Sequence, residues 1–117
     1  MWNEPTVEQL SKIPKLYQTE NVPLKDKPIH LHFFIGGCDW FISEYDGEAL
    51  FFGYASLNND VDMAEWGYIS LAELKSTKIP PGFEIDCEIY DPPRMVSEFG
   101  EILIENRIFR GAEVTVQ

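Results

Sequence analysis

Basic residues are scarce in this chain, and one long stretch lacks them altogether. The sequence contains nine lysines and arginines and twenty aspartates and glutamates, which gives a formal net charge of −11. Residues 28–74 contain no lysine or arginine, yet they carry Asp39, Glu44, Asp46, Glu48, Asp60, Asp62, Glu65 and Glu73. Contacts to nucleic-acid phosphates depend on lysine and arginine. The charge balance therefore argues against nucleic acid as a direct ligand.

Cysteine and long apolar runs are also scarce. The two cysteines, Cys38 and Cys87, are too few for a disulfide framework, and we expect reduced thiols. No apolar run approaches the roughly 20 residues that a membrane-spanning helix needs. The first ten residues have neither the basic nor the apolar region of a signal peptide. We therefore expect a soluble, cytoplasmic protein with no membrane partner.

Alternating apolar positions are abundant. In residues 29–35 and 83–89, every second residue is apolar, as in half-buried strands. Further strands are expected over residues 38–45, 49–57 and 65–70, and the last strands over residues 102–109 and 112–116. With 117 residues and 44% hydrophobic content, the chain is long enough for a single core. The pattern predicts one α+β domain over residues 1–117, with a mostly antiparallel meander sheet of five or six strands.

Sequence patterns typical of helices and turns lie before and between these predicted strands. Thr6-x-x-Gln9 and Ser70-x-x-Glu73 are typical of capping boxes, and they predict two short helices. Asp46-Gly47 lies between two strand patterns and predicts a two-residue type I′ hairpin.

The acids of residues 28–74 are the first candidate site. A surface of one charge sign attracts cations or basic proteins. We expect the binding residues to be Glu44, Asp46, Glu48, Asp60, Asp62 and Glu65, together with Trp66 as an aromatic left uncovered by helices. The alternative is that these acids only keep a small protein soluble.

The second candidate site is a histidine pair. His30 and His32 are two apart on a strand, so they project to one side and could share a metal ion. Cys38 or Asp39 could supply a third ligand, and Cys38 could act as a nucleophile, although its neighbours are acids. This predicts a small metal-binding protein or hydrolase as the alternative. The interpretation as an acidic protein-binding surface, by contrast, needs no metal, no cofactor and no catalytic residue.

The sequence resembles a bacterial family of small domains of unknown function. The resemblance covers about residues 2–88 and is carried by "PKLY", "HFFIGGCDW", "EYDG", "LFFGY" and "AEWGYISLAELKS". It implies a context on plasmids, phages and other mobile elements, often beside anti-restriction or plasmid-maintenance genes, and it implies no activity. With the acidic span, it suggests an accessory or inhibitor protein that mimics nucleic-acid charge. The expected partner is a basic host or phage protein, for example a host defence or replication protein.

Overall fold

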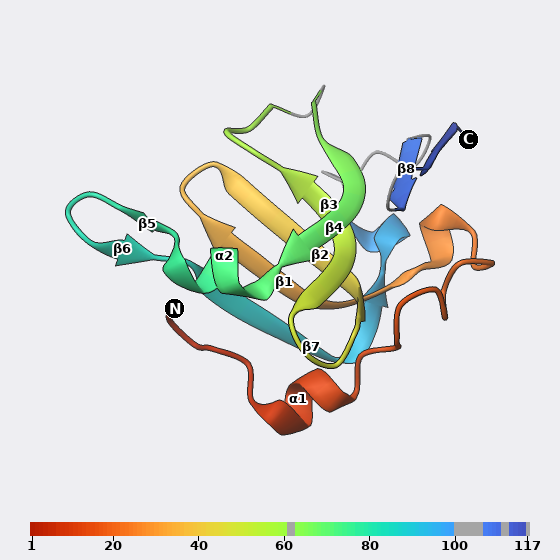
Figure 1. Ribbon diagram of the computed structural model, residues 1–117, viewed down its shortest axis with the longest axis horizontal. Coiled ribbons are helices and arrows are strands. Elements are labelled where there is room, and N and C mark those ends of the chain that lie inside the picture. The colour runs from red at the N-terminus through yellow and green to blue at the C-terminus, as the bar shows by residue number, and fades with distance from the viewer. Residues whose placement is uncertain (61–62, 100–106, 111–112, 117) are drawn as a thin grey trace.

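The computed structural model describes residues 1–60, 63–99, 107–110 and 113–116. It shows an α+β fold in which a largely antiparallel sheet is accompanied by two short α-helices (Figure 1). This confirms the fold class expected from the sequence. The two strands expected last in the chain are present over residues 107–110 and 113–116, and the rest of their predicted ranges lies outside the described residues. They bring the large sheet to seven strands, against the five or six expected.

The large sheet has seven strands in the order β7-β1-β2-β3-β4-β8-β9. Their bounds are β1 Pro28–Ile35, β2 Cys38–Tyr45, β3 Leu50–Ser56, β4 Glu65–Ser70, β7 Asp86–Met95, β8 Arg107–Arg110 and β9 Glu113–Val116. The meander holds for β1 to β4, whereas β7 pairs antiparallel with the outer edge of β1, and β8 runs parallel to β4. A separate two-stranded sheet consists of β5 Lys78–Ile79 and β6 Phe83–Glu84. The return of β7 to β1 brings a second set of acids beside the first strand.

Both expected helix starts are present. In α1 (Val7–Ser11), the Thr6 hydroxyl accepts a hydrogen bond from the Gln9 amide at 3.1 Å, and the Gln9 side chain accepts one from the Thr6 amide at 2.8 Å. In α2 (Leu71–Ser76), Ser70 Oγ accepts from the Glu73 amide at 3.3 Å. Short 3₁₀ turns are η1 (Leu24–Asp26) and η2 (Val96–Glu98). Among the described residues, no helix is both long and apolar enough to cross a membrane.

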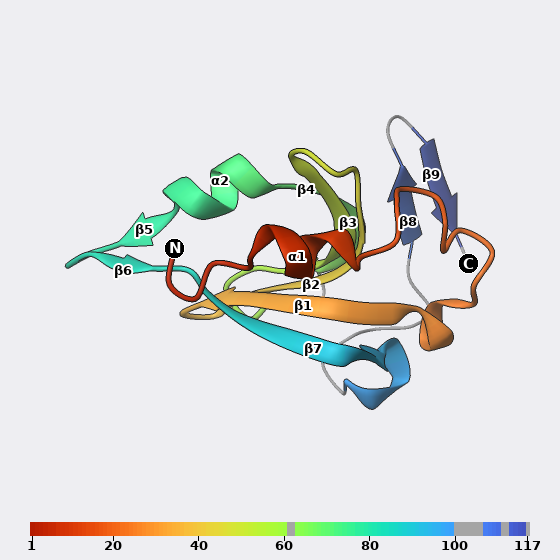
Figure 2. The ribbon, with the colours of Figure 1, turned by 90° about the horizontal axis from the view of Figure 1, so that it is seen from below.

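Apolar side chains are buried on both faces of the sheet. Figure 2 shows α1 and α2 on the same side of β1, and the cluster on that face contains Ile13, Leu31, Phe33, Ile35, Ile42, Tyr45, Phe51, Ile69, Leu71, Leu74, Ile85 and Cys87. The segment after α1 and the η2 turn cover the second face, whose cluster contains Leu24, Ile29, Phe41, Phe52, Tyr54, Trp66, Val96 and Phe99. All four odd-numbered residues of β1 are buried, as the alternation of residues 29–35 predicted. Ile29, however, belongs to the second cluster, because the pairing of β1 with β7 shifts register between Ile29 and Leu31.

The turn between β2 and β3 differs from the prediction in its length. The hairpin exists, but residues 46–49 form the loop, and the Asp46 amide donates to the Leu50 carbonyl at 2.8 Å. Gly47 has a φ of +92°, whereas Asp46 does not adopt the positive φ that a type I′ turn requires of both central residues. Asp46 instead acts through its carboxylate, whose Oδ1 accepts hydrogen bonds from the amides of Glu48, Ala49 and Leu50. The two-residue turn prediction was therefore wrong.

Candidate functional site

The acids predicted to form one binding surface lie at two ends of the sheet. Asp46 and Glu48 are exposed in the β2–β3 loop, whereas Asp60 and Glu65 are exposed at the far end of β3. A strand rises about 3.3 Å per residue, so the length of β3 separates these pairs by roughly 20 Å. Asp62 lies outside the described residues.

Glu44 is not a surface residue, which corrects its assignment as a binding residue. Its side chain is fully buried and faces the second cluster, opposite Phe52 on β3. The carboxylate accepts hydrogen bonds from the Tyr17 amide at 2.8 Å and from the Thr19 amide at 3.0 Å. The Thr19 hydroxyl also donates to it, and the buried Lys27 ammonium donates to the Thr19 carbonyl. Glu44 therefore fastens the segment after α1 to the sheet and is not available to a partner.

Trp66 is also fully buried, so its assignment as an exposed aromatic is wrong. Its ring stacks on Phe52 with centroids 5.9 Å apart and meets Tyr54 edge-on at 5.6 Å. We expected helices to cover most of the aromatic side chains and to leave Trp66 exposed. The physical reason for the error is that the η1 turn and the end of the segment after β7, which contribute Leu24 and Phe99, cover this face as well.

His32 lies between two carboxylates. Its Nε2 is 2.7 Å from Asp39 Oδ1, and its Nδ1 is 3.3 Å from Glu88 Oε1. The ring stacks on Phe41 with centroids 4.3 Å apart and planes inclined by only 6°. Both ring nitrogens therefore have partners, and neither is turned toward an open space where a metal or substrate would bind.

The histidine and cysteine set predicted for the alternative function is not assembled. Cys38 packs against the cluster that contains Leu31, whereas His32 stacks on Phe41 of the other face. Among the described residues, no group of three histidine, cysteine, aspartate or glutamate side chains could hold a metal ion. His30, His32, Cys38 and Asp39 therefore do not form one site in this arrangement, because alternate strand residues send Cys38 and Asp39 to opposite faces.

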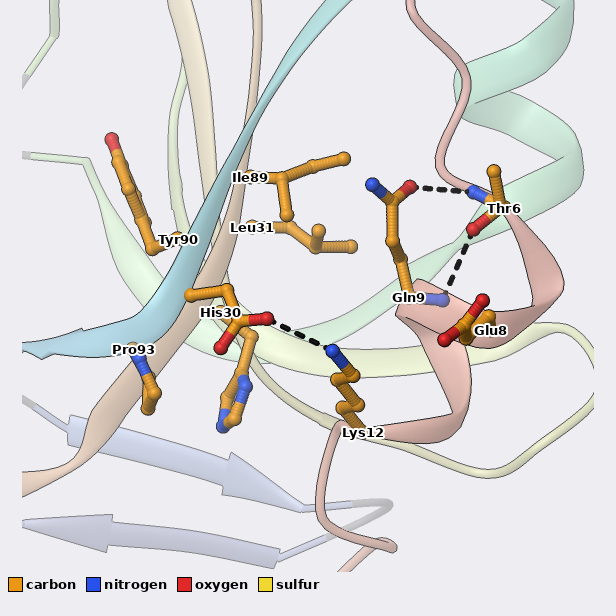
Figure 3. Close-up of a pocket in the computed structure, with 10 residues that line it drawn as sticks. Thr6, Glu8, Gln9, Lys12, His30, Leu31, Ile89, Tyr90 and Pro93 are labelled. Atoms are coloured by element: carbon orange, nitrogen blue, oxygen red, sulfur yellow. Dashed lines mark hydrogen bonds and ion pairs between the residues drawn. The ribbon is translucent and has the colours of Figure 1, made fainter.

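His30 lies in a different place, in a cleft of about 500 Å³ between α1 and the β1–β7 pair (Figure 3). Leu31 and Ile89 form part of its lining, and Lys12 Nζ pairs with Asp91 Oδ2 at 2.9 Å across it. Burial lowers the pKa of His30, and the nearby Asp91 charge opposes this only in part. The neutral form of His30 is therefore favoured, and its buried Nε2 has no hydrogen-bond partner within the described residues. The lining includes no cysteine or serine that could act as a nucleophile.

A third feature lies at the end of the sheet where β1 stops and β2 begins. Here Asp39 of β2 and Asp86 of β7 lie directly opposite Phe34 of β1, one on each side. The β3–β4 loop is joined to the same end, since the Asn59 amide donates to the Gly37 carbonyl at 2.8 Å. We call this region the acidic end and define it by five carboxylates that are exposed or partly exposed: Asp39, Asp60, Glu65, Asp86 and Glu88.

Sequence reasoning missed the contribution of β7 to this region. Asp86 and Glu88 lie outside the lysine-free span and were assigned only to the outer face of a strand. The pairing of β7 with β1 is a long-range contact that no local pattern predicts. Phe83 was expected on the buried face with Ile85, but it is exposed because the strand is interrupted at Ile85, between β6 and β7.

Cys87 is expected to react slowly with thiol reagents in the folded protein. It is buried, and burial, reinforced by the charges of Asp86 and Glu88, raises the pKa of its thiol to about 12. At pH 8 the thiolate fraction is then about 10⁻⁴. Mass spectrometry after timed labelling should find modification of the less buried Cys38 well before Cys87. Labelling of Cys87 as rapid in the native state as in denaturant would contradict the strand register.

Comparisons with known proteins identify a family and no function. A search of curated proteins finds no match, and a search of solved structures finds none either. A family model described as "Protein of unknown function (DUF2958)" matches residues 8–105. The match extends past residue 88, where the resemblance seen in the sequence ended. It covers most of the chain, and the protein therefore belongs to the DUF2958 family of proteins of unknown function.

Proposed function

We propose that this protein is a small acidic accessory protein that binds a basic surface of another protein. The observation that carries the proposal is the acidic end, where carboxylates from β2, the β3–β4 region and β7 gather. Strands β1 to β4 contribute no lysine or arginine to it. On neighbouring β5, Lys78 is already 3.6 Å from Glu84. Charges of one sign at one end attract a basic partner and speed its association.

The proposal extends to the class of protein that is bound. The resemblance to domains of plasmids, phages and other mobile elements favours a cytoplasmic host defence or replication protein. Such proteins carry lysine and arginine where they bind phosphates. An acidic protein that occupied that surface would act as an inhibitor by mimicking nucleic-acid charge, and it would need no catalytic residue, metal or cofactor.

A capture experiment with charge-reversed variants tests the proposal. The test variant carries Asp60→Lys, Glu65→Lys and Glu88→Lys at the acidic end. The control carries Glu20→Lys, Asp26→Lys and Glu48→Lys, which make the same charge change at exposed positions elsewhere. At about 0.05 M salt, immobilised wild type and control should retain the same partners from a bacterial lysate, and the test variant should lose them. Retention by the wild type should also fall at about 0.5 M salt, because ions screen exposed charges.

Two results would count against the proposal. Partners that stay bound equally well at both salt concentrations would show that charge does not direct binding. Equal retention by all three proteins would show that the acidic end serves only solubility.

A further inference from the structure

An exposed aromatic hollow lies beside the acidic end. It has a volume of about 290 Å³ and is lined by Trp2, Phe34, Ile35, Gly36, Ile79, Phe83, Glu84 and Asp86. Its residues come from elements that lie together, since β5 and β6 project beyond the large sheet and the N-terminal segment lies beside them (Figure 2). The hollow thus combines residues from three separate parts of the chain.

The apolar side chains of this hollow are unusually open to solvent. Trp2 is 45% exposed, Ile79 41% and Phe83 50%. The rings of Trp2 and Phe83 meet edge-on with centroids 5.9 Å apart. Exposed aromatics gathered at one place are typical of interaction sites, because burying them in a complex releases water from apolar surface.

Hydrogen bonds hold the wall of the hollow in place. The Trp2 amide donates to the Ile85 carbonyl at 2.9 Å, which fixes the N-terminal segment against the chain between β6 and β7. Asn3 Nδ2 donates to Asp86 Oδ1 at 2.7 Å, and the Cys87 amide donates to the same oxygen at 2.8 Å. A site whose side chains are already positioned loses less conformational entropy on binding.

The unpaired charge at the hollow selects a cationic occupant. Glu84 in its lining is already paired with the Met1 ammonium and with Lys78, whereas none of the ion pairs among the described residues involves Asp86. The cross-strand row Asp86–Phe34–Asp39 also places a carboxylate on each side of Phe34. Both hydrogen bonds described for the Asp86 carboxylate are accepted by Oδ1, which leaves Oδ2 to accept from a ligand. An arginine side chain fits this chemistry best, because its planar guanidinium stacks on aromatic rings and also donates to carboxylates.

We propose that the aromatic hollow is the docking site for a partner segment that carries an arginine beside an apolar residue. The arginine contacts Trp2 or Phe83 and donates to Asp86, while the apolar residue covers Ile79. The docking site rests on the proposed function, which supplies the positive charge of the partner. It adds the place on this protein where the partner binds and the side chains that make the contact. An anionic membrane surface fits less well, since the acids beside the hollow would repel its headgroups.

Calorimetry with a defined peptide tests the docking site. The probe is a synthetic hexapeptide, Gly-Leu-Arg-Leu-Arg-Gly, and its counterpart has glutamate in place of arginine. The test variant is Phe83→Ala with Asp86→Asn. The matched control is Val7→Ala with Glu48→Gln, which removes one exposed apolar side chain and one charge elsewhere on the surface. Circular dichroism and slow labelling of Cys87 verify that both variants are folded.

The wild type should bind the arginine peptide at low salt and not the glutamate peptide. The test variant should lose about tenfold or more in affinity, as expected for removing an aromatic and charged anchor, while the control changes by less than about threefold. Equal losses in both variants would overturn the docking site but leave the proposed function intact. Failure to bind the arginine peptide at about 1 mM, or equal binding of both peptides, would overturn the docking site whatever the lysate capture shows.

Two other occupants of the hollow are also tested. Sedimentation that shows a wild-type dimer, dissociated by Phe83→Ala, would assign the hollow to a second copy of this chain. Binding to neutral phosphatidylcholine vesicles that is abolished by Phe83→Ala would assign it to a membrane. Either result would overturn the proposal. A wild-type protein that stays monomeric and does not bind the vesicles supports it.

Discussion

Replacing Gly53 with alanine is expected to destabilise the protein by about 3 kcal/mol or more, at or beyond the upper end of the usual range for an overpacked core. Gly53 is central in the sheet, paired with Ile42 of β2 and Gly67 of β4. An added Cβ would lie 2.9 Å from the Phe41 carbonyl carbon, inside van der Waals contact, and closer still to its oxygen. These are backbone atoms of a buried strand, so the β2–β3 pairing itself would have to shift.

Urea denaturation measures this loss, and Gly36→Ala is the control. Unlike Gly53, Gly36 has a positive φ of +54°, a conformation that favours glycine, and nothing lies within 4 Å of an added Cβ. Its substitution should therefore cost only the backbone strain, about 1 kcal/mol. Similar midpoints for Gly53→Ala and the wild type would show that β2 and β3 are not paired as described.

Replacing Glu44 with alanine is expected to cost about 3–5 kcal/mol, a large part of the stability of a domain of this size. The change leaves the amides of Tyr17 and Thr19 without their acceptor. It also removes a negative charge from the buried group that contains Thr19 and the Lys27 ammonium. Glu44→Gln should cost less, about 1–3 kcal/mol, since the amide keeps the shape and one acceptor oxygen.

The control for Glu44 is a neighbouring acid in a different environment. Glu48→Ala, in the exposed β2–β3 loop, should change the free energy of unfolding by no more than about 0.5 kcal/mol. If Glu44→Ala were as mild, the carboxylate would be on the surface, as its sequence context first indicated. The prediction therefore separates a buried structural acid from a solvent-exposed acid within one hairpin.

Local patterns predicted the elements of this fold well. The period-two burial of residues 29–35 and the N-caps Thr6 and Ser70 depend on neighbours within a few residues, and all three are present, although only Thr6 forms the full reciprocal capping box. The Asp46-Gly47 signal located the hairpin but not its length. The Asp46 side chain accepts three amides and so stabilises a longer loop, which dipeptide preferences do not encode.

The site was harder to predict because it depends on pairing between distant segments. Glu44 carries a charge, which usually means exposure, and only the approach of Thr19 and Lys27 makes its burial favourable. Trp2 belongs to no periodic pattern, and its place beside Phe83 follows from the contact between the N-terminal segment and Ile85. The composition predicted the negative sign of the charge, but it could not predict that the acidic end and the hollow would carry it.

The most direct test of the account is to map where a basic segment binds. The protein labelled with ¹⁵N would be titrated with the arginine peptide while amide and indole chemical shifts are followed. The account predicts changes confined to the acidic end and the hollow, with the Trp2 indole and the Phe34 and Asp86 amides among the largest. Changes centred on the β2–β3 loop around Glu48, or on the cleft around His30, would contradict it.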